Sequence, residues 1–377
     1  MERHRALRMT EQLRAELADA GTAAALPERA MFAVPAARYR DAAWCERERA
    51  ALFGGPRIVT ASASLAVNES LPVDRPGRGA GAAIITRGLD GVVRAFANAC
   101  RHRGTRLIDA PCSAKALVCP YHAWTYDLTG ALIHVPHAEA FPGLEPSHRG
   151  LVPLPVAERH GLVWLGAGVD GYLGEIGEDL AAIGLDRHVL WKRARTERRC
   201  NWKLVVEAFL DGYHIRTLHR DTIYRFFLDA ASVADPAGPH IRAISGRRTL
   251  HEAPADLSGA DPRQYATPSL LLFPSTIVIE HPDYVSIMTM TPLAADRTEW
   301  DHMMLIPAAR AGEAEHWDRS WTLIEDGVFQ REDLWVCEQA QRGIDGGATD
   351  ELVFGALEYA VRFFHDAIGR ALDAAPA

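Results

Sequence analysis

Two neighbouring segments of the chain read Cys100-Arg101-His102 and Cys119-Pro120-Tyr121-His122, with sixteen residues between them. Each segment brings one cysteine and one histidine close together, so each can supply one thiolate and one imidazole to a metal. The short internal spacings suit two tight loops, in which Gly104 assists the first turn and Pro120 stiffens the second. We therefore expect the two loops to hold one metal cluster between them.

Two cysteines on one iron and two histidines on the other form the ligand set of a Rieske [2Fe-2S] cluster, whose imidazoles raise the reduction potential. The predicted cluster ligands are Cys100, His102, Cys119 and His122. Cysteine and histidine pairs with similar gaps also form zinc sites. A zinc-stabilised binding protein is therefore an alternative, and it would be colourless and free of sulfide.

The residues around these ligands, 98–107 and 119–130, resemble the Rieske non-haem iron oxygenases almost residue for residue. Members of this family are large subunits that hydroxylate or demethylate small organic substrates. High-potential respiratory Rieske proteins carry an additional cysteine in each cluster loop, where this chain has Thr105 and Tyr121. The resemblance extends from about Leu26 to Gln341 and implies a cluster of the lower-potential, oxygenase type.

Length and charge agree with a two-domain enzyme. The chain has 377 residues, of which about 250 lie beyond a Rieske module. The net charge of −8 provides no basic surface for nucleic acid, and no apolar run is long enough to span a membrane. We expect small-molecule partners, with neither nucleic acid nor membrane among them.

Two features indicate a cytoplasmic protein. Residues 1–20 mix arginine and glutamate with leucine and alanine, which predicts an amphipathic helix and not a signal peptide. The cysteines outside the cluster are scattered without a disulfide framework and are predicted to be buried thiols; they are Cys45, Cys112, Cys200 and Cys337.

The patterns along the chain predict an α+β fold. Helical signals extend to about residue 52, and a glycine-rich connector occupies 166–174. Between them, short apolar runs bounded by Gly, Asp and Pro predict antiparallel strands at 82–86, 92–97, 116–118, 131–135 and 162–165. We predict an N-terminal helical segment packed on the catalytic domain (1–44), a β-rich Rieske domain (45–165), and a larger catalytic domain with an antiparallel sheet flanked by helices (166–377).

A second informative segment extends from Asn201 to His219 and is predicted to be a helix that carries Asp211 and His214 one turn apart. His219 lies five residues beyond His214, about 140° around an ideal helix. Both histidines can bind one metal only if the helix ends or distorts between them, and Gly212 makes such a distortion easier.

Two histidines and one carboxylate form the facial triad of non-haem iron(II) oxygenases, which leaves coordination positions open. The resemblance implies that His214 and His219 are two of the ligands, because family members carry Asp-x2-His-x4-His after their cluster. The third predicted ligand is Asp333, because related oxygenases carry a similar Asp followed at the same spacing by counterparts of Glu338 and Gln341. Glu332 is the competing acid, since spacing alone cannot separate adjacent residues.

Further expectations follow only from the resemblance. The acid that matches Asp211 links a cluster histidine of one subunit to an iron histidine of its neighbour, which implies an electron bridge and a homotrimer. Electrons would come from NAD(P)H through a reductase or ferredoxin. Many relatives have Asn near the iron where this chain has Ala208.

We predict a terminal oxygenase, either a mono- or a dioxygenase, that hydroxylates or demethylates a small organic substrate. An aromatic compound is favoured, and a choline- or betaine-like amine is the alternative. Predicted aromatic and sulfur side chains of the pocket would stack on an arene or bind an ammonium through cation–π contacts; they are Phe209, Tyr213, Phe226, Phe227, Tyr284 and Met288. An electron carrier without catalytic iron is the alternative from another class.

Overall fold

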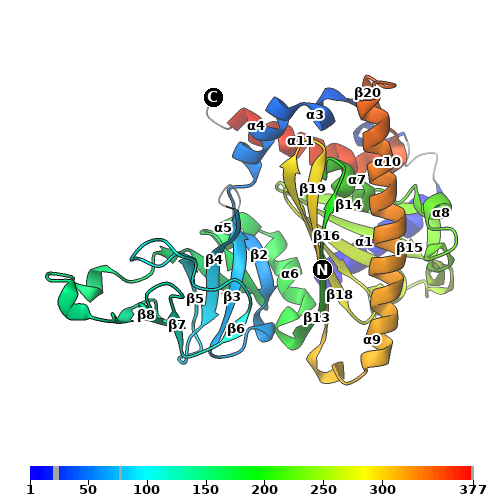
Figure 1. The fold of residues 1–377 in the computed structure, drawn as a ribbon. Helices are drawn as coiled ribbons and strands as arrows, with labels where there is room; N and C mark the ends of the chain where they lie inside the picture. Colours follow the sequence, from blue (N-terminus) through cyan, green and yellow to red (C-terminus); the bar gives the residue numbers. More distant parts are fainter. Residues whose placement is uncertain (20–24, 76–78, 375–377) are drawn as a thin grey trace. The chain divides into compact units, whose positions relative to one another are not determined.

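The computed structural model describes residues 1–19, 25–75 and 79–374 of the chain. It contains two compact units (Figure 1). Unit 1 comprises residues 1–54, 173–184 and the described part of 189–377, and unit 2 comprises 55–172 and 185–188. No helix of the described residues is long and apolar enough to cross a membrane.

The units divide later in the chain than the predicted boundaries after residues 44 and 165. Helix α4 (Ala42–Leu52) stays in unit 1 because Leu52 is buried in the core of that unit. At the other boundary, the ring of Tyr172 contacts Trp164 at 6.2 Å between centroids, so the glycine-rich connector remains in unit 2 almost to its end. The connector also contains a short helix, α5 (Val169–Leu173), which its glycines did not suggest.

Unit 2 is built of short antiparallel strands around two apolar cores. A five-stranded sheet has the order β10-β5-β4-β3-β6, and two three-stranded sheets have the orders β11-β12-β2 and β7-β8-β9. Strands occur at all five predicted positions. The bounds are β2 Arg57–Ala61, β3 Glu69–Arg75, β4 Gly79–Arg87, β5 Val93–Ala97, β6 Cys112–Ser113, β7 Ala116–Val118, β8 Thr125–Asp127, β9 Leu132–His134, β10 Pro153–Leu154, β11 Val156–Arg159 and β12 Leu162–Leu165.

Unit 1 contains a seven-stranded antiparallel sheet of order β13-β19-β18-β17-β16-β15-β14. Six of its strands follow one another in the chain, and β13 pairs with β19 at one edge. The bounds are β13 His188–Arg198, β14 Phe227–Ala237, β15 His240–Arg247, β16 Ala266–Leu272, β17 Thr276–Glu280, β18 Val285–Ala294 and β19 Arg297–Pro307. A separate pair is formed by β1 (Phe32–Pro35) and β20 (Glu351–Phe354).

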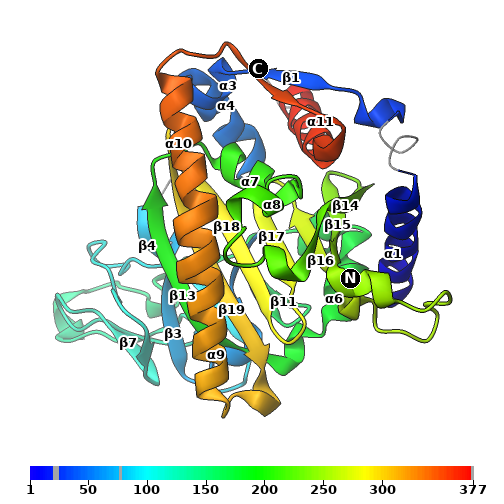
Figure 2. The same ribbon diagram turned by 90° about the vertical axis from the view of Figure 1, so that its right-hand side faces the viewer.

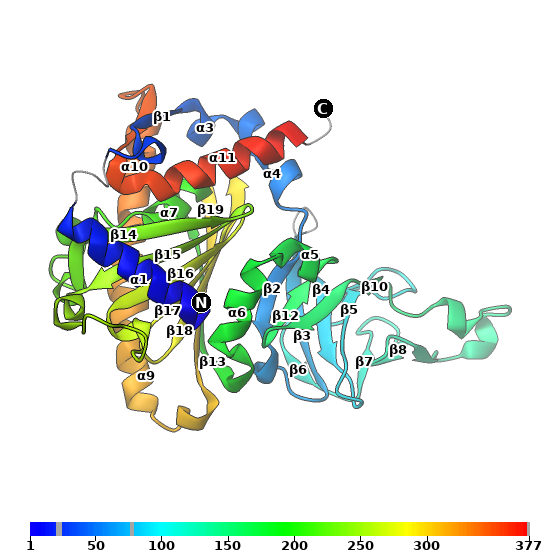
Figure 3. The same ribbon diagram turned by 180° about the vertical axis from the view of Figure 1, so that it is seen from behind.

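Helices flank this sheet, as the α+β prediction requires. In Figure 2, α7 (Trp202–Leu210) and α8 (Ile215–Leu218) lie at the sheet, and α7 contacts β18 and α10 (Leu334–Asp345). Figure 3 shows α1 (Arg3–Ala18) and α11 (Tyr359–Ala374) beside β14 and β15. Further α-helices among the described residues of unit 1 are α3 Ala37–Arg40, α6 Ile176–Ile183 and α9 Ala314–Trp321.

The start of α7 is anchored by polar groups that are fully paired. Asn201 caps the helix by accepting a hydrogen bond from the Lys203 amide. The Lys203 ammonium lies 2.7 Å from a Glu48 carboxylate oxygen, and each side chain is only 1% exposed. Because a buried charge is tolerated only when it is paired, this contact ties α7 to α4.

Candidate metal centres and substrate cavity

The two cysteine-histidine loops of unit 2 close in the same way. In the first, the Cys100 amide donates to the Thr105 carbonyl at 2.8 Å, and the Gly104 amide donates to the Cys100 carbonyl at 2.9 Å. In the second, the Cys119 amide donates to Trp124 at 2.9 Å, and the Ala123 amide donates to Cys119 at 3.0 Å. The two loops are thus equivalent in backbone although their histidines stand at different positions.

The fourth residue after each cysteine adopts a left-handed conformation, with φ of 79° at Gly104 and 55° at Ala123. Glycine takes this conformation without strain, which supports the predicted turn at Gly104. Alanine rarely adopts this conformation, so the residue type at position 123 does not predict the second turn.

Both predicted cluster cysteines, Cys100 and Cys119, belong to one of the two apolar cores of unit 2. Cys100 and Cys119 are each 3% exposed, whereas the rings of His102 and His122 are only partly buried and lie 4.8 Å apart between centroids. His122 Nδ1 is buried without a hydrogen-bond partner among the described residues. An orphaned imidazole nitrogen beside two buried thiols fits a metal cluster, since a buried polar atom otherwise requires a partner.

Neighbouring side chains hold these ligands. The His102 ring stacks on Trp124 at 4.8 Å. The hydroxyl of Tyr126 lies 3.3 Å from Cys100 Sγ and accepts a hydrogen bond from the Arg101 amide at 2.9 Å. Burial, followed by the bond to Cys100, raises the pKa of Tyr126, so the phenol stays protonated and can donate to a thiolate.

In unit 1, the predicted single helix from Asn201 to His219 is wrong. Helix α7 ends at Leu210, and Asp211 is extended, with its carboxylate accepting the Tyr213 amide in a turn typical of aspartate. At Gly212, a Cβ atom would lie 2.0 Å from Ser232 Oγ, so a larger residue would require the Ser232 side chain to move. His214 and His219 then flank the separate helix α8.

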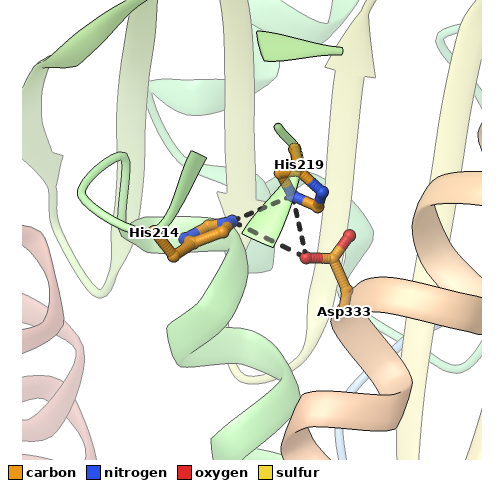
Figure 4. Close-up of side chains that lie close together, drawn as sticks. All are labelled: His214, His219 and Asp333. Atoms are coloured by element: carbon orange, nitrogen blue, oxygen red, sulfur yellow. Dashed lines mark hydrogen bonds and ion pairs between the residues drawn. The ribbon is translucent and has the colours of Figure 1, made fainter. Parts of the chain in front are cut away.

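This break brings the three predicted iron ligands together, as Figure 4 shows. His214 Nε2 lies 3.1 Å from His219 Nε2, and Asp333 Oδ1 lies 3.6 Å and 3.2 Å from these two nitrogens. Asp333 ends η10 (Thr322–Asp333), a π-helical stretch between α9 and α10. π-helical turns occur frequently at functional sites. Two imidazoles and one carboxylate that converge in this way fit a mononuclear iron.

A second carboxylate stands behind each imidazole. Asp211 Oδ2 lies 3.1 Å from His214 Nδ1, and Glu332 Oε2 lies 2.7 Å from His219 Nδ1. The hydroxyl of Thr222 also donates to Glu332 Oε2, at 2.7 Å. Such outer carboxylates orient an imidazole and direct its other nitrogen toward a metal.

The surroundings of His219 favour a cation at this position. Burial lowers the pKa of His219, but Asp333 and then Glu332 raise it, and the outcome is about 9. In the metal-free chain the His219 imidazole is therefore protonated at neutral pH, and it carries the positive charge beside the Asp333 and Glu332 carboxylates.

The spacing from Asp333 to Glu338 and Gln341 has a structural reason. Glu338 Oε1 accepts a hydrogen bond from the Arg199 amide at 3.0 Å, and Gln341 Oε1 accepts one from the Asn201 amide at 2.9 Å. Both side chains of α10 thus bind the backbone at the start of α7. These bonds fix the helix that carries Asp333 against the segment that leads to both histidines.

A cavity of about 270 Å³ opens beside the three ligands. Four of the predicted pocket residues line it: Phe209, Phe226, Phe227 and Tyr284. Tyr213 and Met288 do not line it, because Tyr213 is 58% exposed and Met288 is 0% exposed in the core. Ala208 also lines the cavity.

Polar lining residues were missed by the sequence analysis, because they come together only through strand pairing. They are Ser245 and Arg247 on β15, Thr267 and Ser269 on β16, and His281 after β17. No local motif marks any of them.

Comparison with known families identifies the class of this protein. Residues 185–374, which are 190 of the 377 residues, match the ring hydroxylating alpha subunit (catalytic domain), and residues 57–152 match the Rieske [2Fe-2S] domain. The chain therefore belongs to the ring-hydroxylating alpha subunits of the Rieske non-haem iron oxygenases.

Individual relatives include two kinds of oxygenase. The carnitine monooxygenase oxygenase subunit of Escherichia coli (strain K12) is 27% identical, with 90% of this chain and 93% of that protein covered. The chlorobenzene dioxygenase subunit alpha of Cupriavidus sp. (strain PS12) is 35% identical, with 42% and 38% covered. A solved quaternary ammonium Rieske monooxygenase has the same fold, with a TM-score of 0.78, 21% identity, and 92% and 96% of the two chains covered.

As a member of this family, the chain is an oxidoreductase. It is a terminal oxygenase component that uses O2 and reductase-supplied electrons to hydroxylate or demethylate a small organic substrate. The family carries a Rieske [2Fe-2S] cluster and a mononuclear iron. Membership of this family argues against both alternatives that the sequence left open, a zinc-stabilised binding protein and an electron carrier without catalytic iron.

Proposed function

We propose that His214, His219 and Asp333 hold the mononuclear iron and that the substrate binds in the adjacent cavity. The observation that carries this proposal is the convergence of three ligand atoms within 4.8 Å of one another at the cavity wall. When bound by three protein ligands, iron(II) supplies open positions for oxygen. The apolar walls formed by Phe209, Ile324 and Phe329 exclude water from the reacting part of the substrate.

Cys100, His102, Cys119 and His122 are proposed to hold the cluster. Asp211 is proposed as the bridge that carries electrons from the cluster of one subunit to the iron of another. Its contact with His214 Nδ1 supports one half of this route, and its side chain remains 15% exposed. Inter-subunit electron transfer is known for the solved quaternary ammonium Rieske monooxygenase, which supports the other half by analogy. A bridge between chains requires an oligomer, and a homotrimer closes such a head-to-tail contact into a ring.

The electron donor is proposed to be a reductase or ferredoxin that draws on NAD(P)H. Nicotinamide cofactors suit a reducing compartment, and so do Cys45, Cys112, Cys200 and Cys337, the cysteines outside the cluster loops, which form no disulfide, so we propose a cytoplasmic location.

For the substrate, we propose an N-methylated or quaternary amine as the first candidate. Similarity to the carnitine monooxygenase subunit covers nearly the whole chain, whereas similarity to the chlorobenzene enzyme covers less than half. An aromatic substrate, favoured by the sequence analysis, is the second candidate, because the rings of Phe209, Phe226 and Phe227 line the cavity.

The test is a single turnover of chemically reduced, iron-loaded protein under ¹⁸O-labelled oxygen with members of both substrate groups. Formaldehyde release from an N-methylated compound would support the first candidate, and a labelled hydroxyl group on an arene would support the second. Cluster oxidation that is indifferent to every compound would contradict both assignments.

A further inference from the structure

Among the described residues that line the cavity, Arg247 is the arginine. It ends β15, opposite Phe227 of β14, and its side chain is partly buried. Its guanidinium donates to the Thr267 hydroxyl at 3.3 Å and lies 5.6 Å from the ring centroid of Phe227. The neutral Thr267 hydroxyl and Phe227 ring thus position the Arg247 guanidinium, and its remaining N–H groups are available to bind a group in the cavity.

No carboxylate of the described residues lies within ion-pair distance of Arg247. Two arginines of unit 1 that are buried are paired with carboxylates: Arg242 binds Asp179, and Arg29 binds Glu16. The acids that line the cavity are Asp211 and Asp333, and both are engaged with the histidines of the iron site. Arg247 therefore carries a positive charge that the chain does not compensate.

The pKa values of Arg247 and His281 agree with the absence of a nearby carboxylate among the described residues. Burial lowers the pKa of Arg247, and no carboxylate raises it. His281 adds no charge, because burial, followed by His302 and Arg247, lowers its pKa to about 3. A guanidinium remains protonated at neutral pH in spite of such a shift, so the uncompensated charge persists.

Hydroxyl groups beside Arg247 complete a polar patch. Ser245 lies opposite Thr267 on the neighbouring strand, and Ser269 follows two residues later on the same face. The rest of the wall is mostly apolar, with Phe209, Ile324 and Phe329 among its members. The cavity therefore combines a polar patch with one guanidinium on the sheet, an apolar region and the proposed iron ligands.

We propose that Arg247 binds a carboxylate of the substrate. This inference rests on the proposed function, in which the substrate lies beside the iron ligands. A guanidinium and a carboxylate pair through two parallel hydrogen bonds, and their bond is strengthened by partial burial. The substrate is then an organic acid or a zwitterion with an apolar or N-methylated part, since Arg247 repels a simple cation such as choline.

The carboxylate can belong to a quaternary ammonium acid or to an aromatic acid, and binding of matched pairs distinguishes the two. The protein is loaded with iron(II), kept without oxygen, and titrated with γ-butyrobetaine against choline and with benzoate against benzyl alcohol. The expected result is that the acid of one pair binds about tenfold to a hundredfold more tightly than its partner. The preferred pair identifies the source of the carboxylate.

The variant Arg247→Met should remove this preference, while Arg247→Lys should retain part of it. Arg248→Met is the matched control, because Arg248 is exposed, does not line the cavity, and rests on the ring of Tyr224. Iron and sulfide contents should stay unchanged in all three variants, which separates a lost anion site from a lost metal site.

Equal binding of both members of each pair, unchanged binding to Arg247→Met, or no binding of either acid to the wild type would overturn the carboxylate assignment. Each of these outcomes leaves the iron ligands in place if the iron content is normal. Absence of the mononuclear iron would instead contradict the proposed function on which this inference rests.

Discussion

Glu332 Oε2 lies 2.7 Å from His219 Nδ1, on the side of the imidazole opposite to the nitrogen that faces Asp333. Two consecutive acids thus contact the two nitrogens of one histidine. The π-helical backbone that ends at Asp333 places them in this way. These contacts agree with different proposed tasks for the two acids, which sequence spacing could not separate: Asp333 faces the proposed metal position, and Glu332 orients His219.

We predict that Glu332→Gln weakens iron(II) binding by about tenfold to a hundredfold without removing the site, as expected for an outer partner of a metal ligand. Asp333→Asn should have the larger effect, because it removes a ligand charge. The measurement is the dissociation constant for iron(II), determined without oxygen, with the cluster spectrum as an internal control. A greater loss in Glu332→Gln than in Asp333→Asn would reverse the two assignments.

Asp211→Asn should retain both the cluster and the mononuclear iron but slow electron transfer between them. The amide preserves the size of the side chain while it removes the charge that the two imidazoles would share. Rapid mixing of reduced protein with oxygen and substrate measures the rate of cluster oxidation. Asp256→Asn, on an exposed loop, is the matched control. Equal rates in the two variants would argue against the bridge.

Tyr126→Phe should lower the reduction potential of the cluster. Its hydroxyl lies 3.3 Å from Cys100 Sγ, and hydrogen bonds to ligand sulfur atoms raise the potential of iron-sulfur clusters. A redox titration followed by electron paramagnetic resonance gives the potential directly. Tyr172→Phe removes a distant hydroxyl of the same unit and should leave the potential unchanged. An unaltered potential in Tyr126→Phe would show that this hydroxyl does not bond to the cluster ligand.

Binding of iron(II) should depend on pH. With a pKa of about 9, His219 is protonated below that pH in the metal-free chain, and it must lose its proton to bind a metal. Affinity should therefore rise about tenfold per pH unit between neutral pH and about 9, with about one proton released per iron. Calorimetry in buffers of different ionisation enthalpy counts the proton. A pH-independent affinity would mean that His219 is neutral before the metal binds.

Asp333 could be selected as a ligand only through the resemblance to the family, whereas the other predicted ligands lie in short motifs whose residues stay close after folding. The loops at Cys100 and Cys119 are examples, since each is closed by hydrogen bonds within six residues. The path of the chain between such motifs was less predictable. Residues 201–219 have a helical pattern, but α7 ends at Leu210, where Asp211 is extended and its carboxylate accepts the Tyr213 amide.

The polar wall of the cavity could not be predicted, because tertiary contacts create it. Arg247, Thr267 and Ser269 lie on two strands whose register brings them together, and each alone is an ordinary strand residue. Tertiary contacts also remove a residue that was predicted to line the pocket. Met288 has a suitable side chain and lies opposite Ile277, on the same face of the sheet as the cavity-lining Ile279, but it packs in the core, where it is 0% exposed.

His214, His219 and Asp333 are proposed to hold an iron separate from the cluster. This proposal is tested by measuring iron and acid-labile sulfide per chain on anaerobically purified wild type and His214→Ala. The wild type should contain about three irons to two sulfides, and the variant about two to two with its cluster spectrum intact. Two irons to two sulfides in the wild type after addition of iron(II), or three irons in His214→Ala, would contradict the assignment.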